Sequence, residues 1–263
     1  VNQVVRKVKK MVPAFALPTA VRFNEALARG AQLSLQQPEV GPDDVAVLQY
    51  TGGTTGVSKG AVLLHRNLLA NVLQSEAWNR PVMRRVPADE QSTSICALPL
   101  YHIFAFTVNM MLSMRTGGMN VLIPNPRDIG KFVEVLKRRP FHMLPAVNTL
   151  FNALLQHPAF RSVDFSHLCI SQAGGMAASE GTAKHWQQAT GSAMIEGWGM
   201  SETCAIGTNN PVIAKHFSGT IGLPLPSIDI AIKDDDGNSL AIGEAGEICI
   251  KGPNVMHGYY KQP

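Results

Sequence analysis

The chain has 263 residues, with 23 Lys and Arg against 19 Asp and Glu, which gives a formal net charge of +4. Hydrophobic residues make up 45% and charged residues 16% of it. This is ordinary globular usage, and it excludes disorder, collagen and coiled coil as descriptions of the whole chain. The small positive surplus forms no clustered stripe, so no nucleic-acid partner is indicated.

Basic residues gather in the ranges 6–10, 84–85 and 137–139. An anionic membrane surface is one partner for such groups, and a solvated protein face is the favoured interpretation. The cysteines are Cys96, Cys169, Cys204 and Cys249. They form no Cys-x-x-Cys pair, so neither a zinc site nor a disulfide framework is predicted, and a reducing cytosol fits them. The longest apolar stretch, 100–114, is shorter than a bilayer span and predicts a buried helix.

From residue 45 onward, short apolar runs alternate with segments of helical period, which predicts an α/β fold with a mostly parallel sheet flanked by helices. The predicted strands are 45–50, 93–98, 119–123, 141–144, 168–172 and 193–196. Their continuous hydrophobicity indicates buried central strands. Apolar residues recur at helical spacing in 129–136 and 150–155, and these stripes should pack on the sheet.

The residue pattern changes after Pro224, from helical spacing to alternation. Isoleucines alternate with other residues over 228–233, the turn-rich segment 234–238 follows, and a second extended run covers 247–251. This pattern predicts a β-hairpin. A calcium loop is the rejected alternative, because its acidic positions would alternate and a glutamate would close it. We therefore expect an α/β domain over 1–223 and the start of a β-rich subdomain over 224–263.

A glycine- and hydroxyl-rich stretch at 50–60 directly follows the first predicted strand. Its glycines let backbone amides approach a ligand, its hydroxyls add donors, and Lys59 adds a compact positive charge. The residues expected to contact phosphate oxygens are Thr51, Gly52, Gly53, Thr54, Thr55, Gly56, Ser58 and Lys59. A flexible turn is the alternative. The Walker loop is excluded, because Lys59 lies between Ser58 and Gly60 rather than between Gly and Ser or Thr.

This stretch resembles the signature loop of the adenylate-forming enzymes, which join a carboxylic acid to AMP and pass the acyl group to a thiol or amine. A second motif of that family, Glu-Gly-Trp-Gly-Met-Ser-Glu-Thr, occupies 196–203. Its chemistry is also reasonable by itself. The indole of Trp198 offers a stacking face, and the carboxylate of Glu202 is a ligand that Mg²⁺ prefers. A simple turn from strand to helix is the alternative for this motif alone.

The resemblance implies a role for each motif residue. The implied ligands of the ATP phosphates are Lys59, Thr51, Thr54 and Thr55, with Ser201 at the α-phosphate. Adenine would stack on Trp198, where the family usually has Tyr, and Mg²⁺ would be held by Glu202 and Thr51. The expected cofactor-binding residues of the second motif are Glu196, Gly197, Trp198, Gly199, Met200 and Ser201.

Further segments match the family in chain order. His102 corresponds to a histidine near the phosphates, followed by acyl-channel aromatics such as Phe106; the alternative is a core histidine. Gly174 and Gly175 correspond to a turn that lies against adenine and the acyl group; the alternative is a bare strand-to-helix connection. The segment 246–260 matches a structural part of the family and is assigned no chemistry. The predicted catalytic residues are Lys59, Glu202 and His102.

Within this family the chain is most similar to bacterial long-chain acyl-CoA synthetases, through segments 8–13, 98–104, 125–128, 147–154 and 223–227. This implies ATP- and Mg²⁺-dependent activation of a fatty acid through an acyl-adenylate, and transfer to coenzyme A. The implied location is cytoplasmic, with peripheral contact at the inner membrane surface.

The family's ribose-binding Thr-Gly-Asp and its lysine-bearing C-terminal domain are not found in the sequence, so we interpret the chain as an internal piece of the large N-terminal domain. Two alternatives remain. The chain is a nucleotide- or acyl-binding module without turnover, or it activates an aryl or amino acid. Acyl chain length and oligomeric state are not predicted.

Overall fold

The computed structural model describes residues 4–8, 10–13, 16–51 and 58–262, and the chain divides into two units, Val1–Val40 and Gly41–Pro263. The first unit contains the π-helical turn η1 (Val4–Val8) and helix α1 (Phe23–Gly30). Glu25 and Arg29 form an ion pair of 2.6 Å along α1, and none of the α1 residues is buried. The sheets and the candidate site belong to the second unit.

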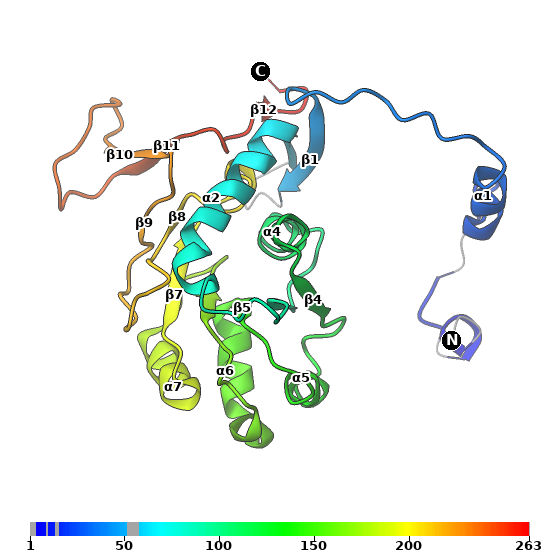
Figure 1. Ribbon diagram of the computed structural model, residues 1–263. Coiled ribbons are helices and arrows are strands. Elements are labelled where there is room, and N and C mark those ends of the chain that lie inside the picture. The colour runs from blue at the N-terminus through cyan, green and yellow to red at the C-terminus, as the bar shows by residue number, and fades with distance from the viewer. Residues whose placement is uncertain (1–3, 9, 14–15, 52–57, 263) are drawn as a thin grey trace. The chain divides into compact units, whose positions relative to one another are not determined.

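A seven-stranded sheet in the order β4-β3-β5-β6-β7-β8-β9 forms the centre of the second unit (Figure 1). Its strands are β3 (Thr93–Cys96), β4 (Met119–Leu122), β5 (Met143–Ala146), β6 (Ile170–Ala173), β7 (Met194–Trp198), β8 (Thr208–Asn209) and β9 (Leu223–Pro224). The pairs from β4 to β7 are parallel, and β8 and β9 pair antiparallel. The predicted α/β class and the strands predicted between 93 and 196 are confirmed.

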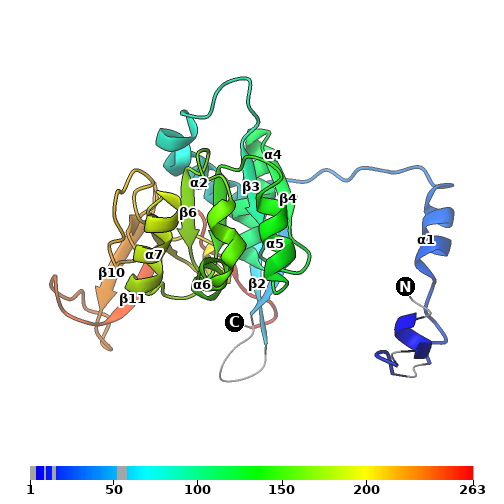
Figure 2. The same ribbon diagram turned by 90° about the horizontal axis from the view of Figure 1, so that it is seen from below.

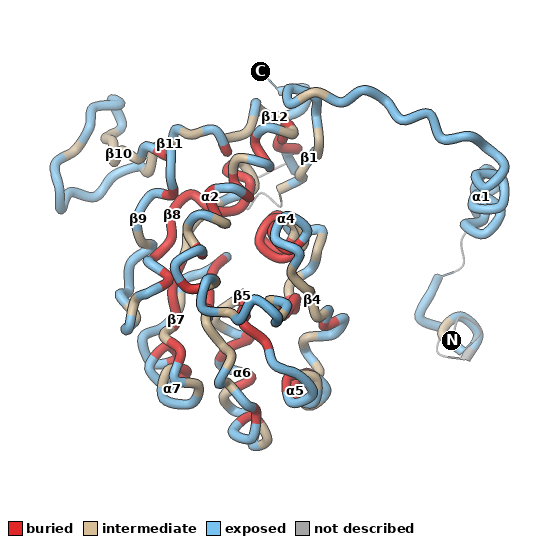
Figure 3. Tube along the Cα trace, in the orientation of Figure 1, coloured by how far each residue is buried: buried red, intermediate tan, exposed pale blue. Residues whose placement is uncertain are grey.

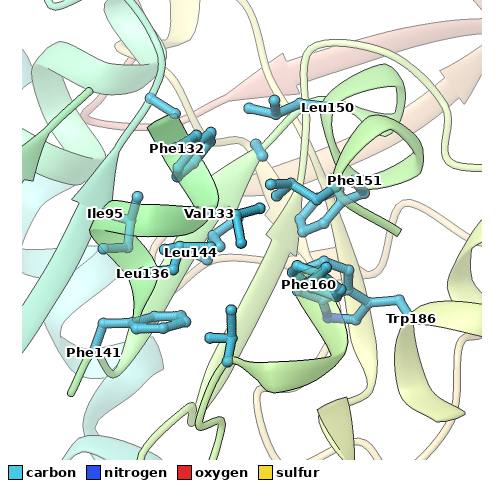
Figure 4. Packing of buried hydrophobic residues seen from close by; sticks show 14 of the residues in the cluster. Ile95, Phe132, Val133, Leu136, Phe141, Leu144, Leu150, Phe151, Phe160 and Trp186 are labelled. Atoms are coloured by element: carbon cyan, nitrogen blue, oxygen red, sulfur yellow. The ribbon is translucent and has the colours of Figure 1, made fainter. Parts of the chain in front are cut away.

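Helices α5 (Ile129–Leu136), α6 (Asn148–Gln156) and α7 (Glu180–Thr190) cover one face of this sheet (Figure 2). The short turn η3 (Pro158–Ser162) follows α6. The apolar stripes of α5 and α6 meet Ile95 and Leu144 of the strands in the main core, as predicted (Figure 4). The buried indole of Trp186 donates to Ser171 Oγ at 2.9 Å, so its polar atom is satisfied within this core.

The opposite face of the same strands forms a second apolar layer. Met143 is adjacent in the chain to Leu144, and Ile195 to Met194; Leu144 and Met194 belong to the main core. Successive side chains of a strand alternate between the two faces of a sheet, so Met143 and Ile195 point to the face opposite the main core. They pack with Val72 of helix α2 (His65–Met83) and with Leu112. Both faces of β5 are covered, and all of its residues are buried.

The predicted buried helix at 100–114 is confirmed as a continuous helical segment of α3 (Ile103–Ala105), the π-helical η2 (Phe106–Met111) and α4 (Leu112–Thr116). Gly117 ends it with a φ of +70°, the left-handed conformation common after helices. Within the described ranges, no helix has both the length and the apolarity that a bilayer crossing requires.

Strands β1 (Val45–Thr51), β2 (Lys59–Leu64) and β12 (Gly258–Tyr259) form a separate antiparallel sheet. The prediction that 45–50 is a buried strand of the parallel sheet is therefore wrong, since no β1 residue is buried. The reason is the short connection to β2, because a parallel crossover needs a dozen or more residues. Strand β2 was not predicted, because its first two residues, Lys59 and Gly60, belong to the glycine- and hydroxyl-rich stretch 50–60.

Strands β10 (Asp229–Lys233) and β11 (Glu247–Lys251) form the predicted antiparallel hairpin. Its residues are exposed or half-buried, whereas β5 is buried throughout and β7 is buried over its first residues (Figure 3). The Asp234 carboxylate accepts the backbone N–H groups of Asp236 and Asn238, which gives these residues a turn role. The domain boundary between 223 and 224 stays a prediction.

Candidate functional site

The segments that follow β3, β6 and β7 enclose a cavity of about 150 Å³ at the carboxyl edge of the parallel strands. Open α/β sheets bind ligands at this edge. The cavity is lined by His102, Ile103, Phe104, Gln172, Gly174, Gly175, Gly197, Trp198, Gly199, Met200, Ser201, Ala205 and Ile206. The fold thus brings together three segments that the sequence singled out separately.

His102 is exposed at the wall of this cavity, which excludes the core histidine that was its alternative. Its Nδ1 accepts the backbone N–H of Phe104 at 3.2 Å and so caps α3. A ring nitrogen that accepts carries no proton, so Nε2 of the neutral ring carries it. His102 can therefore donate a hydrogen bond to an anionic oxygen in the cavity.

Gly174 allows the β6 segment to approach the helical segment 103–116 closely. A Cβ on Gly174 would lie 2.9 Å from the ring of Phe104, closer than a side chain tolerates. Phe104 is 7% exposed and holds its position in the core of β2 and α2. A glycine is thus required where two walls of the cavity meet.

The turn η4 (Ser201–Thr203) follows β7 and leads into two non-glycine residues with positive φ, Cys204 at +56° and Ala205 at +116°. Such residues cost of the order of 1–3 kcal/mol each and persist only where the surroundings hold them. Strain of this kind often occurs at functional sites. It places Ser201 and Glu202 on a backbone that cannot relax freely.

Three fully buried polar side chains hold this turn, and none was predicted. Asn71 of α2 donates to the Ile206 carbonyl at 2.7 Å and accepts the Ile206 N–H at 3.1 Å. Thr107 donates to the Cys204 carbonyl at 2.8 Å, and Asn254 donates to the Thr203 carbonyl at 2.8 Å. Buried backbone groups must find partners, and here side chains supply them in place of a helix or sheet.

The side chain of Glu202 contacts Tyr259 of β12 in the antiparallel sheet. The Tyr259 hydroxyl donates to Glu202 Oε1 at 2.7 Å, and this bond raises the pKa of the phenol, which keeps it a donor. Lys59 Nζ lies 5.1 Å from the centroid of the Tyr259 ring. Lys59 and Glu202, both predicted at the phosphate end of the site, therefore meet at one tyrosine that the sequence did not mark.

The residues on either side of the glycine-rich loop form hydrogen bonds between the end of β1 and the start of β2. Ser58 Oγ donates to the Thr51 carbonyl at 2.6 Å, and Thr51 Oγ1 donates to the Lys59 carbonyl at 3.3 Å. A donating hydroxyl keeps its lone pairs, so Thr51 can still ligate a cation. The predicted contacts Gly52, Gly53, Thr54, Thr55 and Gly56 lie outside the described residues.

Three residues of the second motif, Glu196, Glu202 and Thr203, do not line the cavity. The side chain of Glu196 is buried, and its Oε1 accepts the Ala178 N–H at 2.7 Å. This bond connects β7 to the segment after β6, whose residues Gly174 and Gly175 line the cavity. Gln172 and Ile206 do line the cavity, and the sequence gave no signal for them because they belong to no motif.

A second group of metal-ligand side chains, Glu90, His142 and His167, lies at the amino ends of the strands. Glu90 Oε1 is 3.4 Å from His142 Nε2 and 3.0 Å from His167 Nδ1. The Thr93 N–H donates to His142 Nδ1 at 3.0 Å, so the neutral ring keeps its proton on Nε2, the atom that a metal would need. Among the described residues His142 Nε2 makes no hydrogen bond, so we interpret this group as two imidazoles within ion-pair distance of one carboxylate.

Residues 3–260 match the family model described as AMP-binding enzyme, so the chain belongs to the AMP-binding enzyme family. It is 48% identical to a long-chain-fatty-acid–CoA ligase of Salmonella typhimurium and 46% identical to one of Yersinia pestis, in both cases over 100% of this chain and 46% of the relative. The chain thus spans about half the length of these curated relatives. The solved structure of ATP-bound MatB from Rhodopseudomonas palustris is similar with a TM-score of 0.77 and 30% identity, over 91% of this chain and 46% of that one.

Proposed function

We propose that this chain supplies the ATP- and acid-binding part of a long-chain fatty acid–CoA ligase. The observation that carries the proposal is that Lys59 and Glu202 both contact Tyr259. Lys59, Glu202 and Tyr259 do not line the cavity itself; Glu202 directly follows Ser201 in the chain, and Ser201 does line it. A cation and a carboxylate beside such a cavity suit a triphosphate with its metal. The names of the relatives at 46% and 48% identity support a fatty acid as the substrate.

The proposed reaction has two displacement steps. The fatty carboxylate attacks the α-phosphorus of ATP, pyrophosphate leaves, and an acyl-adenylate forms. The thiol of coenzyme A then attacks the acyl carbon, loses its proton, and AMP leaves. Neither step needs a protein nucleophile, so catalysis depends on alignment and charge stabilisation. Cys204 is unsuited to be one, because burial raises the pKa of its thiol to about 12.

Each residue then has a defined task. Lys59 stabilises the β- and γ-phosphate oxygens, and Ser201 donates to the α-phosphate. Trp198 offers its half-buried indole to adenine. His102 donates from Nε2 to an oxygen whose charge grows as pyrophosphate leaves. Glu196 positions the wall behind them through its bond to Ala178.

The donor set fits Mg²⁺, which prefers hard oxygen ligands and is held by one or two carboxylates together with substrate phosphates. Glu202 Oε1 is bonded to Tyr259, and among the described residues Glu202 Oε2 accepts no hydrogen bond. Glu202 Oε2 and the Thr51 hydroxyl would hold the ion. When bound, Mg²⁺ neutralises part of the charge on the phosphates.

We propose that the fatty chain runs along the helical segment 103–116. Ile103 lines the first cavity. A second cavity of about 380 Å³ lies toward the amino ends of the strands; Val108, Leu112 and Met143 form its apolar wall, and Glu76, Arg80, Arg84 and Glu90 are among its charged lining residues. Burial of a methylene group contributes about 0.8 kcal/mol. A long apolar chain gains from such a wall, whereas an amino acid or a short aryl acid has few methylenes to bury there.

The test is acyl-adenylate formation by the full-length gene product, followed as pyrophosphate release with palmitate, ATP and Mg²⁺. We expect Glu202→Gln and Lys59→Met each to lower the rate about 100- to 1000-fold, the usual cost of losing one preorganised charge-stabilising group. The control His185→Gln alters an exposed histidine on α7 and should leave the rate unchanged. Unchanged Mg²⁺-dependent adenylate formation in Glu202→Gln would refute the assignment.

The same assay separates the alternatives. ATP binding by the 263-residue chain without pyrophosphate release would favour a binding module for this stretch alone, which fits its 46% share of the relatives. Competition between palmitate, an aryl acid and an amino acid identifies the acid. If the enzyme forms the adenylate of the aryl acid or the amino acid in preference to palmitate, that acid is the substrate in place of a fatty acid.

A cytoplasmic location with peripheral membrane contact also remains a proposal. The exposed Arg84 and Arg85 follow α2 near the rim of the second cavity, which Arg84 lines. Their charges suit an anionic lipid surface. Salt-sensitive binding to anionic vesicles, lost in a double Ala variant, is the expected behaviour.

A further inference from the structure

The strand register explains how Tyr259 reaches Lys59. On β12, Tyr259 pairs with Ala61 of β2, which lies two residues after Lys59. Residues two apart on a strand share a face, so the Tyr259 ring and the Lys59 side chain are diagonal neighbours on one face of this sheet. The distance of 5.1 Å from Lys59 Nζ to the ring centroid is within cation–π range.

The same short strand reaches Glu202 from the other side. The Met256 N–H donates to the Glu202 carbonyl at 2.8 Å, three residues before the Tyr259 hydroxyl donates to Oε1 at 2.7 Å. The backbone and the carboxylate of Glu202 are thus both fixed by the segment 256–259. A phenol bonded to a carboxylate is a charge-assisted hydrogen bond, which is among the stronger ones in proteins.

We propose that Tyr259 is a positioning residue, which holds one oxygen of Glu202, leaves the other for a divalent cation, and keeps the Lys59 ammonium beside its ring. This inference rests on the proposed function, and it assigns strand β12 to the phosphate and metal end of the site. Tyr259 acts through Glu202 and Lys59 and donates no group to the reacting atoms.

The neighbouring Tyr260 offers a matched control. Its side chain is 43% exposed, and its ring contacts Lys261, whose Nζ is 5.2 Å from the centroid, on a residue that the site does not use. Tyr260→Phe removes a hydroxyl from the same short segment without touching Glu202. A difference between Tyr259→Phe and Tyr260→Phe therefore reports on the bond to Glu202.

The experiment measures ATP binding to the 263-residue chain by calorimetry, without Mg²⁺ and over a series of Mg²⁺ concentrations, with thermal unfolding to confirm that each variant is folded. In Tyr259→Phe we expect the half-maximal Mg²⁺ concentration to rise about ten- to hundredfold, as expected for a lost hydrogen bond to a charged group. ATP affinity without Mg²⁺ should stay unchanged, because the ring remains beside Lys59. Tyr259→Leu should also lose about two- to fivefold in ATP affinity without Mg²⁺, because the cation–π contact is lost.

The outcomes separate the inference from the proposed function. A Mg²⁺ dependence in Tyr259→Phe equal to that of the unsubstituted chain and of Tyr260→Phe would overturn the inference alone. Equal losses with and without Mg²⁺ in Tyr259→Phe would do the same, since they indicate a structural role. If the unsubstituted chain binds no ATP at any Mg²⁺ concentration, the proposed function fails, and the inference fails with it.

Discussion

Gly199 is the residue at which a single added methyl group should do most harm. A Cβ there would lie 1.7 Å from the Ala205 carbonyl oxygen, and that carbonyl belongs to the strained turn after η4. We expect Gly199→Ala to lower the free energy of unfolding by about 1–3 kcal/mol through overpacking, and to abolish tight ATP binding because Trp198 and Ser201 shift. Urea unfolding and calorimetry measure the two effects.

Gly181 provides the control for this substitution. It lies in α7, and an added Cβ would meet nothing within 4 Å. In a helix, Ala is favoured over Gly by roughly 0.5–1 kcal/mol, so Gly181→Ala should be neutral or stabilising. A Gly199→Ala chain as stable as this control, with normal ATP binding, would contradict the packing argument.

The structure gives Gly199 a packing role, because Gly199 makes room for the chain's own backbone at Ala205. The assignment of Gly197 and Gly199 to cofactor binding stays a prediction. A glycine pattern identifies positions that exclude a side chain. It does not say what fills the space, because the filling group comes from residues that are adjacent only in the fold.

At the scale of elements, the turn Ser201–Ile206 depends on Asn71 of α2. Replacement by Leu keeps the size but leaves the Ile206 N–H without this partner, whereas the Ile206 carbonyl still accepts from Asn254 at 3.2 Å. We expect Asn71→Leu to cost about 1–3 kcal/mol, the cost of one buried unsatisfied group. Urea unfolding measures this cost. Asn152→Leu on the exposed face of α6 is the control and should change stability by no more than about 0.5 kcal/mol. Equal effects of the two substitutions would disprove the support role.

Elements with a strong period were predictable, and elements defined by a partner were not. Helices α5 and α6 show their apolar stripe in sequence, and the hairpin β10–β11 shows alternation and turn residues. Strand β2 begins inside the glycine-rich stretch 50–60, so its short apolar run 61–64 is not marked off as a strand. The direction of β1 depends on that unseen partner, so it was predicted wrongly.

At the scale of the whole molecule, the order of the parallel strands explains why the separate motifs form one cavity. Strands β5, β6 and β7 are neighbours in the sheet as in the chain, so the segments that follow β6 and β7 must meet. That part of the site follows from fold class and motif order. Tyr259 reaches Glu202 over 57 positions through the pairing of β12 with β2, and no local pattern carries that information.

The amino edge of the same sheet should make the molecule sensitive to acid. His142 is 2% exposed at the start of β5, and burial lowers the pKa of its imidazole below 6.5, against the opposing charge of Glu90, while His167 adds to the lowering. The unfolded chain therefore takes up this proton first as the pH falls. The contribution of His142 to the free energy of unfolding is fully present above pH 6.5, the pKa of an unperturbed imidazole. It is lost as the pH falls from there through the lower pKa of His142 in the folded chain.

Urea unfolding at about pH 7.5 and about pH 5.5 measures this loss. In His142→Asn, the side-chain oxygen can still accept the Thr93 N–H, but the titrating group is gone. We expect this variant to lose less stability between the two pH values than the unsubstituted chain, whereas His185→Asn on the exposed face of α7 should behave like the unsubstituted chain. A His142→Asn chain with the full acid-induced loss would place the sensitivity elsewhere. The expected result would show that burial of the His142 imidazole contributes to the acid sensitivity of the fold that positions Lys59 and Glu202.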